Sequence, residues 1–286
     1  MFIIEMIKTV LIGIIQGITE WLPISSTGHM ILFNAARPLN VPSDFWEMFS
    51  VVIQLGSIMA VVVLYFSKLN PFSKKKTKIE RKSTLNLWGK VLVGSVPAAI
   101  VGLLINDFID SLLYEGEGEL AVRTSGGIVI ACALIVYGVA FILIEKFKKG
   151  EDRAKTVDEI SYKTALGIGA FQMLALIPGT SRSGSTIIGS RLLRVSRVAA
   201  AEFSFFLAIP VMAGASLLKV AKFILDGISM SAELWAYLIV GCLVSFIVSL
   251  VVIRFLTDFL KKHTFVSFGV YRILLGIAVI VWMIFR

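Results

Sequence analysis

The chain has 286 residues, of which 57% are hydrophobic and only 16% are charged. This composition excludes a soluble globular protein, because several apolar runs can cross the ~30 Å hydrocarbon core of a bilayer as helices. The formal net charge of +9 does not indicate a nucleic-acid partner, because the basic residues lie in short loops between the apolar runs. We therefore predict an all-α polytopic membrane protein.

Six apolar runs predict full membrane spans, and the loops between them alternate in charge. The predicted spans are 45–66, 85–105, 120–145, 199–225, 234–256 and 265–285. The basic loops are 67–84, 146–163 and 257–264, and the acidic loops are 106–119 and 226–233. Because loops rich in Lys and Arg stay on the cytoplasmic side, we place the basic loops inside and the acidic loops outside.

Residues 160–195 cannot form a simple span in this topology, because both of their ends then lie on the cytoplasmic side. Pro178 and Gly179 interrupt the apolar stretch, since proline lacks a backbone N–H and glycine tolerates unusual backbone angles. We therefore predict a re-entrant hairpin, in which a helix enters the membrane, breaks and returns as a second helix.

Residues 1–37 show the same design, with a break at Pro23. The two segments also match in sequence at an offset of 156 residues, from 13 to 169 and from 25 to 181. The matching pairs are Gly13-Ile-Ile-Gln16 with Gly169-Ala-Phe-Gln172, and Ser25-Ser-Thr-Gly28 with Ser181-Arg-Ser-Gly184.

The chain therefore divides into two repeats, residues 1–147 and 160–286, within a single membrane domain of residues 1–286. Each repeat holds one re-entrant hairpin and three transmembrane helices. Because three is odd, the repeats have inverted topology, as in many secondary transporters. We expect the two hairpin breaks to meet near the membrane midplane and both termini to lie outside.

The second hairpin carries one fixed positive charge, Arg182, among small and hydroxyl-bearing residues. An arginine at membrane depth is costly unless an anion or a water-filled cavity faces it. Turns of glycine and serine at helix starts bind phosphate-like anions, and arginine binds such anions through paired hydrogen bonds. The candidate phosphate-binding hydroxyls are those of Ser181, Ser183 and Thr186. Small residues such as these also allow helices to cross closely.

The first hairpin supplies candidate chemical groups. Gln16 and Glu20 lie four residues apart and share one helix face, and Ser26 and His29 lie three apart after the break. An ionisable group at membrane depth is a functional candidate. The alternatives are that Glu20 only reaches the membrane interface and that His29 only packs or caps a helix.

If the two breaks meet, Glu20, His29 and Arg182 converge with the hydroxyls of Ser25 and Thr27 and with the N–H groups of two helix starts. A carboxylate that faces a phosphate usually holds a bridging divalent cation or transfers a proton. The pattern therefore favours chemistry on a phosphate. Two further acids begin the spans that follow the hairpins, and either border this site or cap their own helices: Glu47 and Glu202.

Four motifs together resemble the membrane-integral undecaprenyl-diphosphate phosphatases of the bacitracin-resistance type. The resemblance covers essentially the whole chain. The motifs are Gln16-Gly-Ile-Thr-Glu20, Leu22-Pro-Ile-Ser-Ser-Thr-Gly-His29, Pro178-Gly-Thr-Ser-Arg-Ser-Gly-Ser-Thr186 and Glu202-Phe-Ser-Phe. The first motif of that family is Glu or Gln, three residues, then Glu. This chain has the Gln form, so Glu20 supplies the carboxylate there alone.

The resemblance implies hydrolysis of undecaprenyl diphosphate to undecaprenyl phosphate, which recycles the lipid carrier for peptidoglycan synthesis and confers resistance to bacitracin, a competitor for the substrate. It implies a divalent cation, Mg²⁺ or Ca²⁺, held by Glu20 and, as a further candidate, Gln16. It also implies a site that opens to the outer face of the bacterial cell membrane. The expected partners are the polyprenyl diphosphate and membrane lipids, and a homodimer is left open.

On matched positions, the resemblance places the catalytic glutamate of the family on Glu20, its serine–histidine pair on Ser26 and His29, and its phosphate-binding arginine on Arg182. We expect Ser26 to attack with His29 as base, and attack by His29 itself is the alternative. The expected phosphate ligands are Ser25, Thr27, Ser181, Ser183 and Thr186.

Other classes of function compete with this interpretation. Inverted repeats with broken helices are also typical of secondary transporters, so a transporter or flippase of a polyprenyl phosphate or another anion is the main rival. A purely structural membrane scaffold leaves the ionisable residues at depth unexplained. A serine esterase is less favoured, because Gly179-Thr-Ser-Arg-Ser lacks the Gly-x-Ser-x-Gly turn.

Overall fold

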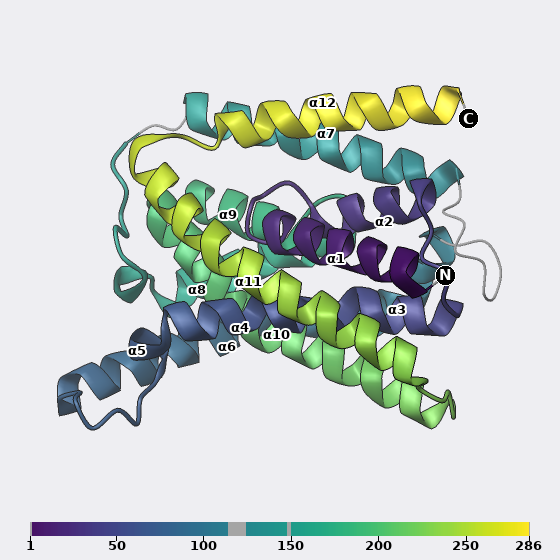
Figure 1. Cartoon of the computed structure of the whole chain (residues 1–286). Helices are drawn as coiled ribbons and strands as arrows, with labels where there is room; N and C mark the ends of the chain where they lie inside the picture. Colours follow the sequence, from purple (N-terminus) through teal and green to yellow (C-terminus); the bar gives the residue numbers. More distant parts are fainter. Residues whose placement is uncertain (1, 114–123, 148–149, 286) are drawn as a thin grey trace.

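The computed structural model describes the backbone of residues 2–113, 124–147 and 150–285, and this part of the chain is helical without a named strand (Figure 1). The first half contains α1 (Phe2–Thr19), α2 (Ser26–Ala36), α3 (Ser43–Val52), α4 (Gln54–Leu64), α5 (Phe66–Leu69), α6 (Lys78–Leu113) and α7 (Thr124–Phe147). The second half contains η1 (Val157–Glu159), α8 (Tyr162–Gln172), η2 (Met173–Leu176), α9 (Arg182–Leu192), α10 (Arg197–Leu225), α11 (Ala232–Lys262) and α12 (Val266–Ile284).

The all-α multi-pass fold predicted from the sequence is confirmed. Seven helices of the described chain are long and apolar enough to cross a membrane: α1, α3 with α4, α6, α7, α10, α11 and α12. Six of these overlap the predicted spans over most of their length, and α1 is the first arm of the predicted N-terminal hairpin. The helix α6 continues to Leu113, past the predicted end of its span. Residues 114–123 of the predicted acidic loop and span lie outside the described residues.

Both predicted breaks are present as helix–break–helix units. Helix α1 ends at Thr19 and α2 begins at Ser26. In the second unit, α8 and η2 end at Leu176, and α9 begins at Arg182. Each returning helix is capped in the same way, because the hydroxyl oxygen of the residue before it accepts a hydrogen bond from the N–H three residues on. These caps are Ser25 to Gly28 and Ser181 to Gly184.

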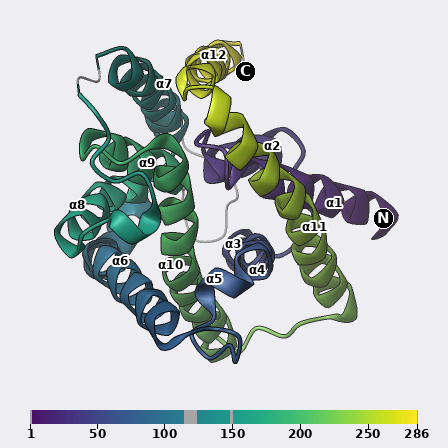
Figure 2. The same cartoon turned by 90° about the vertical axis from the view of Figure 1, so that its left-hand side faces the viewer.

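Each hairpin packs against a long helix of the other half of the chain. Helix α1 lies along α11, and α8 lies along α6, while α7 and α12 pair with each other (Figure 2). Glycines permit the close approach. A Cβ on Gly13 would lie 2.9 Å from Cβ of Val244 in α11, and a Cβ on Gly169 would overlap the backbone of Gly94 in α6. The division into repeats 1–147 and 160–286 stays a prediction, which this exchanged packing supports.

The ends of the helix bundle differ in charge. Both termini lie at the right-hand end in Figure 1, together with the turn between α10 and α11. The basic segment after α5 and the segment before α8 lie at the opposite end. This placement agrees with the alternation of basic and acidic loops in the sequence, and it leaves the two hairpin breaks in the interior between the ends.

Candidate active site

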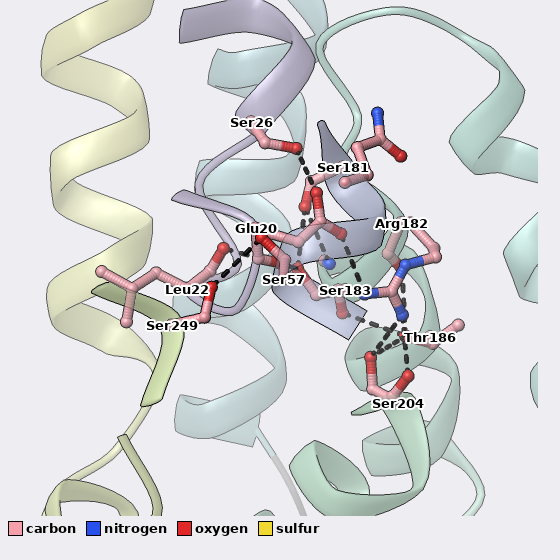
Figure 3. Close-up of polar contacts among 12 residues, drawn as sticks. Glu20, Leu22, Ser26, Ser57, Ser181, Arg182, Ser183, Thr186, Ser204 and Ser249 are labelled. Atoms are coloured by element: carbon pink, nitrogen blue, oxygen red, sulfur yellow. Dashed lines mark hydrogen bonds and ion pairs between the residues drawn. The ribbon is translucent and has the colours of Figure 1, made fainter. Parts of the chain in front are cut away.

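The carboxylate of Glu20 lies where the two breaks meet (Figure 3). Glu20 directly follows α1 and is 5% exposed. Its Oε1 accepts a hydrogen bond from Nη2 of Arg182 at 3.0 Å. Its Oε2 accepts one from Nε2 of Gln16 at 3.0 Å and one from the hydroxyl of Ser26 at 2.7 Å. The two hairpins therefore meet at the contact between Glu20 and Arg182, as the sequence predicted.

Arg182 begins α9 and reaches across to the first hairpin. Its Nη1 donates to the carbonyl of Ser204 at 2.7 Å, and its guanidinium lies over the ring of Trp21 at 5.9 Å. The buried Nε–H has no hydrogen-bond partner within the described chain. Since a guanidinium binds phosphate through parallel N–H groups, this Nε is a donor available for an anion.

The hydroxyls of the second break make hydrogen bonds to the first hairpin, to α10 and within the break itself. Ser183 donates to the carbonyl of Glu20 at 3.2 Å, which joins α9 to the first hairpin. Thr186 donates to the hydroxyl of Ser204 at 2.7 Å, and Ser204 in turn accepts from Arg182 at 3.3 Å. Ser181 is the cap of α9 and lies 3.1 Å from the hydroxyl of Ser183. These contacts orient Arg182.

The hydroxyls of the first break divide by exposure. Ser25 is buried as the cap of α2, whereas the side chain of Thr27 is exposed. Ser26 is half-buried and has the short hydrogen bond to Glu20. Ser26 and Thr27 are therefore the hydroxyls of this break that an incoming ligand can reach.

His29 does not contact Ser26 through a hydrogen bond in this structure. Its Nδ1 lies 2.7 Å from the carbonyl oxygen of Ser25, and its Nε2 lies 2.8 Å from the hydroxyl of Tyr271. A carbonyl has no proton to give, so Nδ1 carries the proton of the neutral ring, and Nε2 accepts from Tyr271. The group that contacts the Ser26 hydroxyl is instead Glu20.

Arg272 of α12 is a central residue that the sequence reasoning missed. It is fully buried. Nη1 donates to the carbonyl of Pro23 in the first break, and Nη2 donates to the carbonyls of Gly179 and Thr180 in the second. The signal was present, because an arginine inside the predicted span 265–285 meets the same criterion that singled out Arg182.

The two acids that follow the hairpins neither reach Glu20 nor cap a helix. Glu202 pairs with Lys68 at 3.0 Å, and Glu47 lies 3.5 Å from Lys219. The cap of α10 is Ser196, and the start of α3 has no side-chain cap. Each pair joins an acid of one half to a lysine of the other half.

A metal site made of protein side chains alone does not occur in the described chain, because no three His, Cys, Asp or Glu side chains are grouped to hold an ion. The side chain of Gln16, whose Nε2 contacts Glu20, nevertheless has an unused oxygen. Oε1 of Gln16 is buried and has no partner among the described residues. An amide oxygen next to a carboxylate is a ligand pair that Mg²⁺ and Ca²⁺ accept.

The arrangement supplies the elements of phosphoryl transfer. A serine hydroxyl donates to a carboxylate that can take its proton, and an arginine held beside that carboxylate has an unused N–H. A hydroxyl group and an anion-binding group are therefore each in hydrogen-bond contact with the same carboxylate, an arrangement that can serve covalent catalysis.

The chain is similar to known proteins over nearly its whole length. Residues 9–278 match the family described as bacitracin resistance protein BacA. An undecaprenyl-diphosphatase of Enterococcus faecalis (strain ATCC 700802 / V583) is 51% identical over 97% of each chain. An undecaprenyl-diphosphatase of Lactococcus lactis subsp. lactis is 50% identical over 99% of this chain and 98% of its own. Undecaprenyl-diphosphatase 1 of Clostridioides difficile is 50% identical over 98% of this chain and 97% of its own. With the paired breaks and their Glu20–Arg182 contact, these matches show that the chain belongs to the bacitracin resistance protein BacA family.

Proposed function

We propose that this chain hydrolyses undecaprenyl diphosphate to undecaprenyl phosphate and phosphate, which recycles the lipid carrier for peptidoglycan synthesis and confers resistance to bacitracin. The names of its relatives support this activity. The observation that carries it is the hydrogen bond from the Ser26 hydroxyl to Glu20, whose other oxygen is paired with Arg182. Bacitracin acts in this proposal by competing for the lipid diphosphate.

In the first step, the Ser26 oxygen attacks the terminal phosphorus. A bond forms between Oγ and phosphorus, the bond from phosphorus to the bridging oxygen breaks, and undecaprenyl phosphate leaves. The hydroxyl proton passes to Oε2 of Glu20, which lies 2.7 Å away. Arg182 neutralises the transferred phosphoryl group through its unused Nε–H, since this chemistry depends mainly on positioning and charge.

In the second step, water hydrolyses the phosphoserine. The bond from Ser26 to phosphorus breaks, and Ser26 recovers its proton from Glu20. The attacking water gives its proton to the Tyr271 hydroxyl, which passes its own proton to Nε2 of His29 along their 2.8 Å hydrogen bond. His29 thus serves as the second base and then releases this proton to the solvent, which restores the starting enzyme, and Ser26 rather than His29 is the nucleophile.

Glu20 and Gln16 fit a divalent cation that arrives with the substrate. The support is the buried, unpartnered Oε1 of Gln16 beside the carboxylate. Mg²⁺ is commonly held by one or two carboxylates together with substrate phosphates. A cation here would neutralise charge on the diphosphate oxygens.

We also place the site on the outer side of the cell membrane, with both termini outside. This orientation is supported by the termini lying at the end opposite to the basic segments (Figure 1). A homodimer stays a prediction.

Phosphate release from undecaprenyl diphosphate by purified protein in detergent tests the activity, with and without a chelator. We expect release by the wild type and loss of release in Ser26→Ala and Glu20→Ala, whereas Ser229→Ala on the exposed turn before α11 matches the wild type. Detergent micelles have no second compartment, so a transporter without hydrolysis releases nothing. Absence of release by the wild type contradicts the proposal, and phosphate trapped on an imidazole nitrogen contradicts Ser26 as nucleophile.

A further inference from the structure

The guanidinium of Arg272 lies between the two hairpin breaks. Its donors reach Pro23 at 3.0 Å in the first break, and Gly179 at 2.7 Å and Thr180 at 3.0 Å in the second. A further donor contact extends to the carbonyl of Ala133 in α7 at 3.5 Å. One rigid, planar group thereby joins α12, α7 and both breaks.

This position determines the distance between the two charged groups of the site. Glu20 lies three residues before Pro23, and Arg182 lies two residues after Thr180. Because the backbone on both sides is fixed to the same guanidinium, a shift of either break relative to the other must stretch these hydrogen bonds. A lysine cannot replace them, since an ammonium lacks the planar fork that serves acceptors in several directions.

The charge of Arg272 is the second notable feature. Within the described chain its partners are carbonyl oxygens and the ring of Tyr137, 5.3 Å from the guanidinium carbon, and none of them is a carboxylate. Arg182, by contrast, is balanced by Glu20. Among the described residues, the contacts at the two breaks therefore involve two arginines, Arg182 and Arg272, and one glutamate, Glu20. A buried charge of this kind calls for an opposite charge, and an anionic ligand supplies it.

We propose that Arg272 is a positioning residue for diphosphate hydrolysis: its fork aligns Glu20 with Arg182, and its uncompensated charge strengthens binding of the diphosphate group. This inference rests on the proposed function. It adds a second role in the site for α12, which already supplies Tyr271 and carries none of the motifs at the two breaks.

Two variants distinguish the alignment by the fork from the effect of the charge. Arg272→Lys keeps the charge and removes the fork, so we expect kcat per folded molecule to fall about 100-fold, as for a misplacement of about 1 Å, with KM within about twofold of the wild type. Arg272→Met removes both, so KM should also rise about tenfold or more. Arg254, which is exposed on α11, gives the matched controls Arg254→Lys and Arg254→Met.

Folding is measured separately from catalysis, by size-exclusion chromatography and thermal unfolding in detergent. A purely structural role lowers the melting temperature of Arg272→Lys but leaves kcat per folded molecule unchanged, and that result overturns the positioning role. If Arg272→Met does not fold, two measurements test the proposal instead. They are the kcat of Arg272→Lys and the binding of inorganic diphosphate by the Ser26→Ala protein that also carries Arg272→Lys.

Binding of inorganic diphosphate to the Ser26→Ala protein provides a readout without turnover. We expect Arg272→Lys in this background to bind within about twofold, and Arg272→Met to bind about tenfold more weakly. Equal binding by Arg272→Met overturns the role of the charge, and a large loss in Arg272→Lys contradicts it as well. If the wild type hydrolyses no lipid diphosphate, the proposed function fails while this binding comparison still tests Arg272.

Discussion

Ser25 and Ser181 lie 156 residues apart and adopt the same unusual backbone conformation, with φ of 79° and 73°. Positive φ is uncommon for residues other than glycine and costs of order 1–3 kcal/mol. Both serines recover part of this cost by capping the helix that follows. The shared conformation turns the backbone at the same place in both breaks. It puts Ser26 and Arg182, the residues that follow the two serines, at equivalent positions on opposite sides of Glu20.

Replacement of Arg182 by lysine should lower kcat/KM by about 10²–10³-fold, the usual loss for one group that stabilises charge in the transition state. Lysine keeps the charge but cannot contact Glu20, Ser204 and a phosphate through one planar group. Phosphate release measures the effect. The control is Arg81→Lys on the exposed start of α6. Activity near the wild type would remove Arg182 from the mechanism.

Gln16→Glu should lower the concentration of Mg²⁺ that gives half-maximal activity. The substitution puts a second carboxylate beside Glu20, and Mg²⁺ sites often use two carboxylates. The measurement is phosphate release over a range of free Mg²⁺. Gln54→Glu, on another helix of the same half, is the comparison. An unchanged Mg²⁺ requirement would argue that the cation does not bind at position 16.

Tyr271→Phe should reduce kcat about 10- to 100-fold, because the hydroxyl that contacts Nε2 of His29 is lost while the aromatic ring remains. The side chain is 43% exposed, so the fold should tolerate the change. Tyr162→Phe is a matched control, at 46% exposure and on α8. A pre-steady-state burst of lipid monophosphate should persist, since only the second step is affected. A variant with unaltered kcat would exclude the relay through Tyr271.

Cysteine labelling tests the orientation in the membrane. In a background without Cys132 and Cys242, we expect Ser229→Cys to react with an impermeant maleimide on intact cells, and Lys75→Cys to react only after permeabilisation. Both positions are exposed, one before α11 and one in the basic segment after α5. The reverse pattern would place the termini and the basic segments on the opposite sides from those proposed.

The ion pair between Lys68 and Glu202 should contribute about 0.2–1 kcal/mol to the free energy of unfolding, as is usual for partly exposed pairs. Lys68→Glu should therefore lower the melting temperature slightly, and the swap of Lys68→Glu with Glu202→Lys should restore it. The same swap at Glu47 and Lys219 should change the melting temperature in the same way, because the two pairs occupy related places in the two halves. An additive loss in the double variant would show that the pair does not couple.

Hydropathy and charge predicted the spans and the two hairpins, because lipid forces apolar runs into helices, and Pro23 and Pro178 lie where those helices are interrupted. The meeting of Glu20 with Arg182 also followed from the inverted topology. The hydrogen-bond partner of the Ser26 hydroxyl could not be predicted in this way. Spacing of three residues favoured His29, but the side chain of His29 turns to α12, and the break folds Glu20 against Ser26. Such a choice depends on backbone angles within a short turn, which residue types alone do not determine.

Polar contacts between residues far apart in the chain could not be predicted from the sequence either. The pairing of Glu202 with Lys68 depends on how α10 packs beside α5, and the contacts of Arg272 depend on where α12 crosses both breaks. The sequence could flag Arg272 as a buried charge within an apolar run. It could not say that the acceptors are backbone carbonyls, because every residue carries one.

The exchanged packing of the hairpins has a consequence for biosynthesis. Helix α1 emerges from the ribosome long before α11, the helix along which it lies, because α11 begins only at Ala232. Gln16 and Glu20 therefore lack their final surroundings until most of the chain has been translated. During this time the polar groups of the N-terminal hairpin are only partly buried by protein. Folding of the first half cannot be completed before the second half is made, so a chain truncated before α11 should be a target for membrane proteases rather than a stable half-protein.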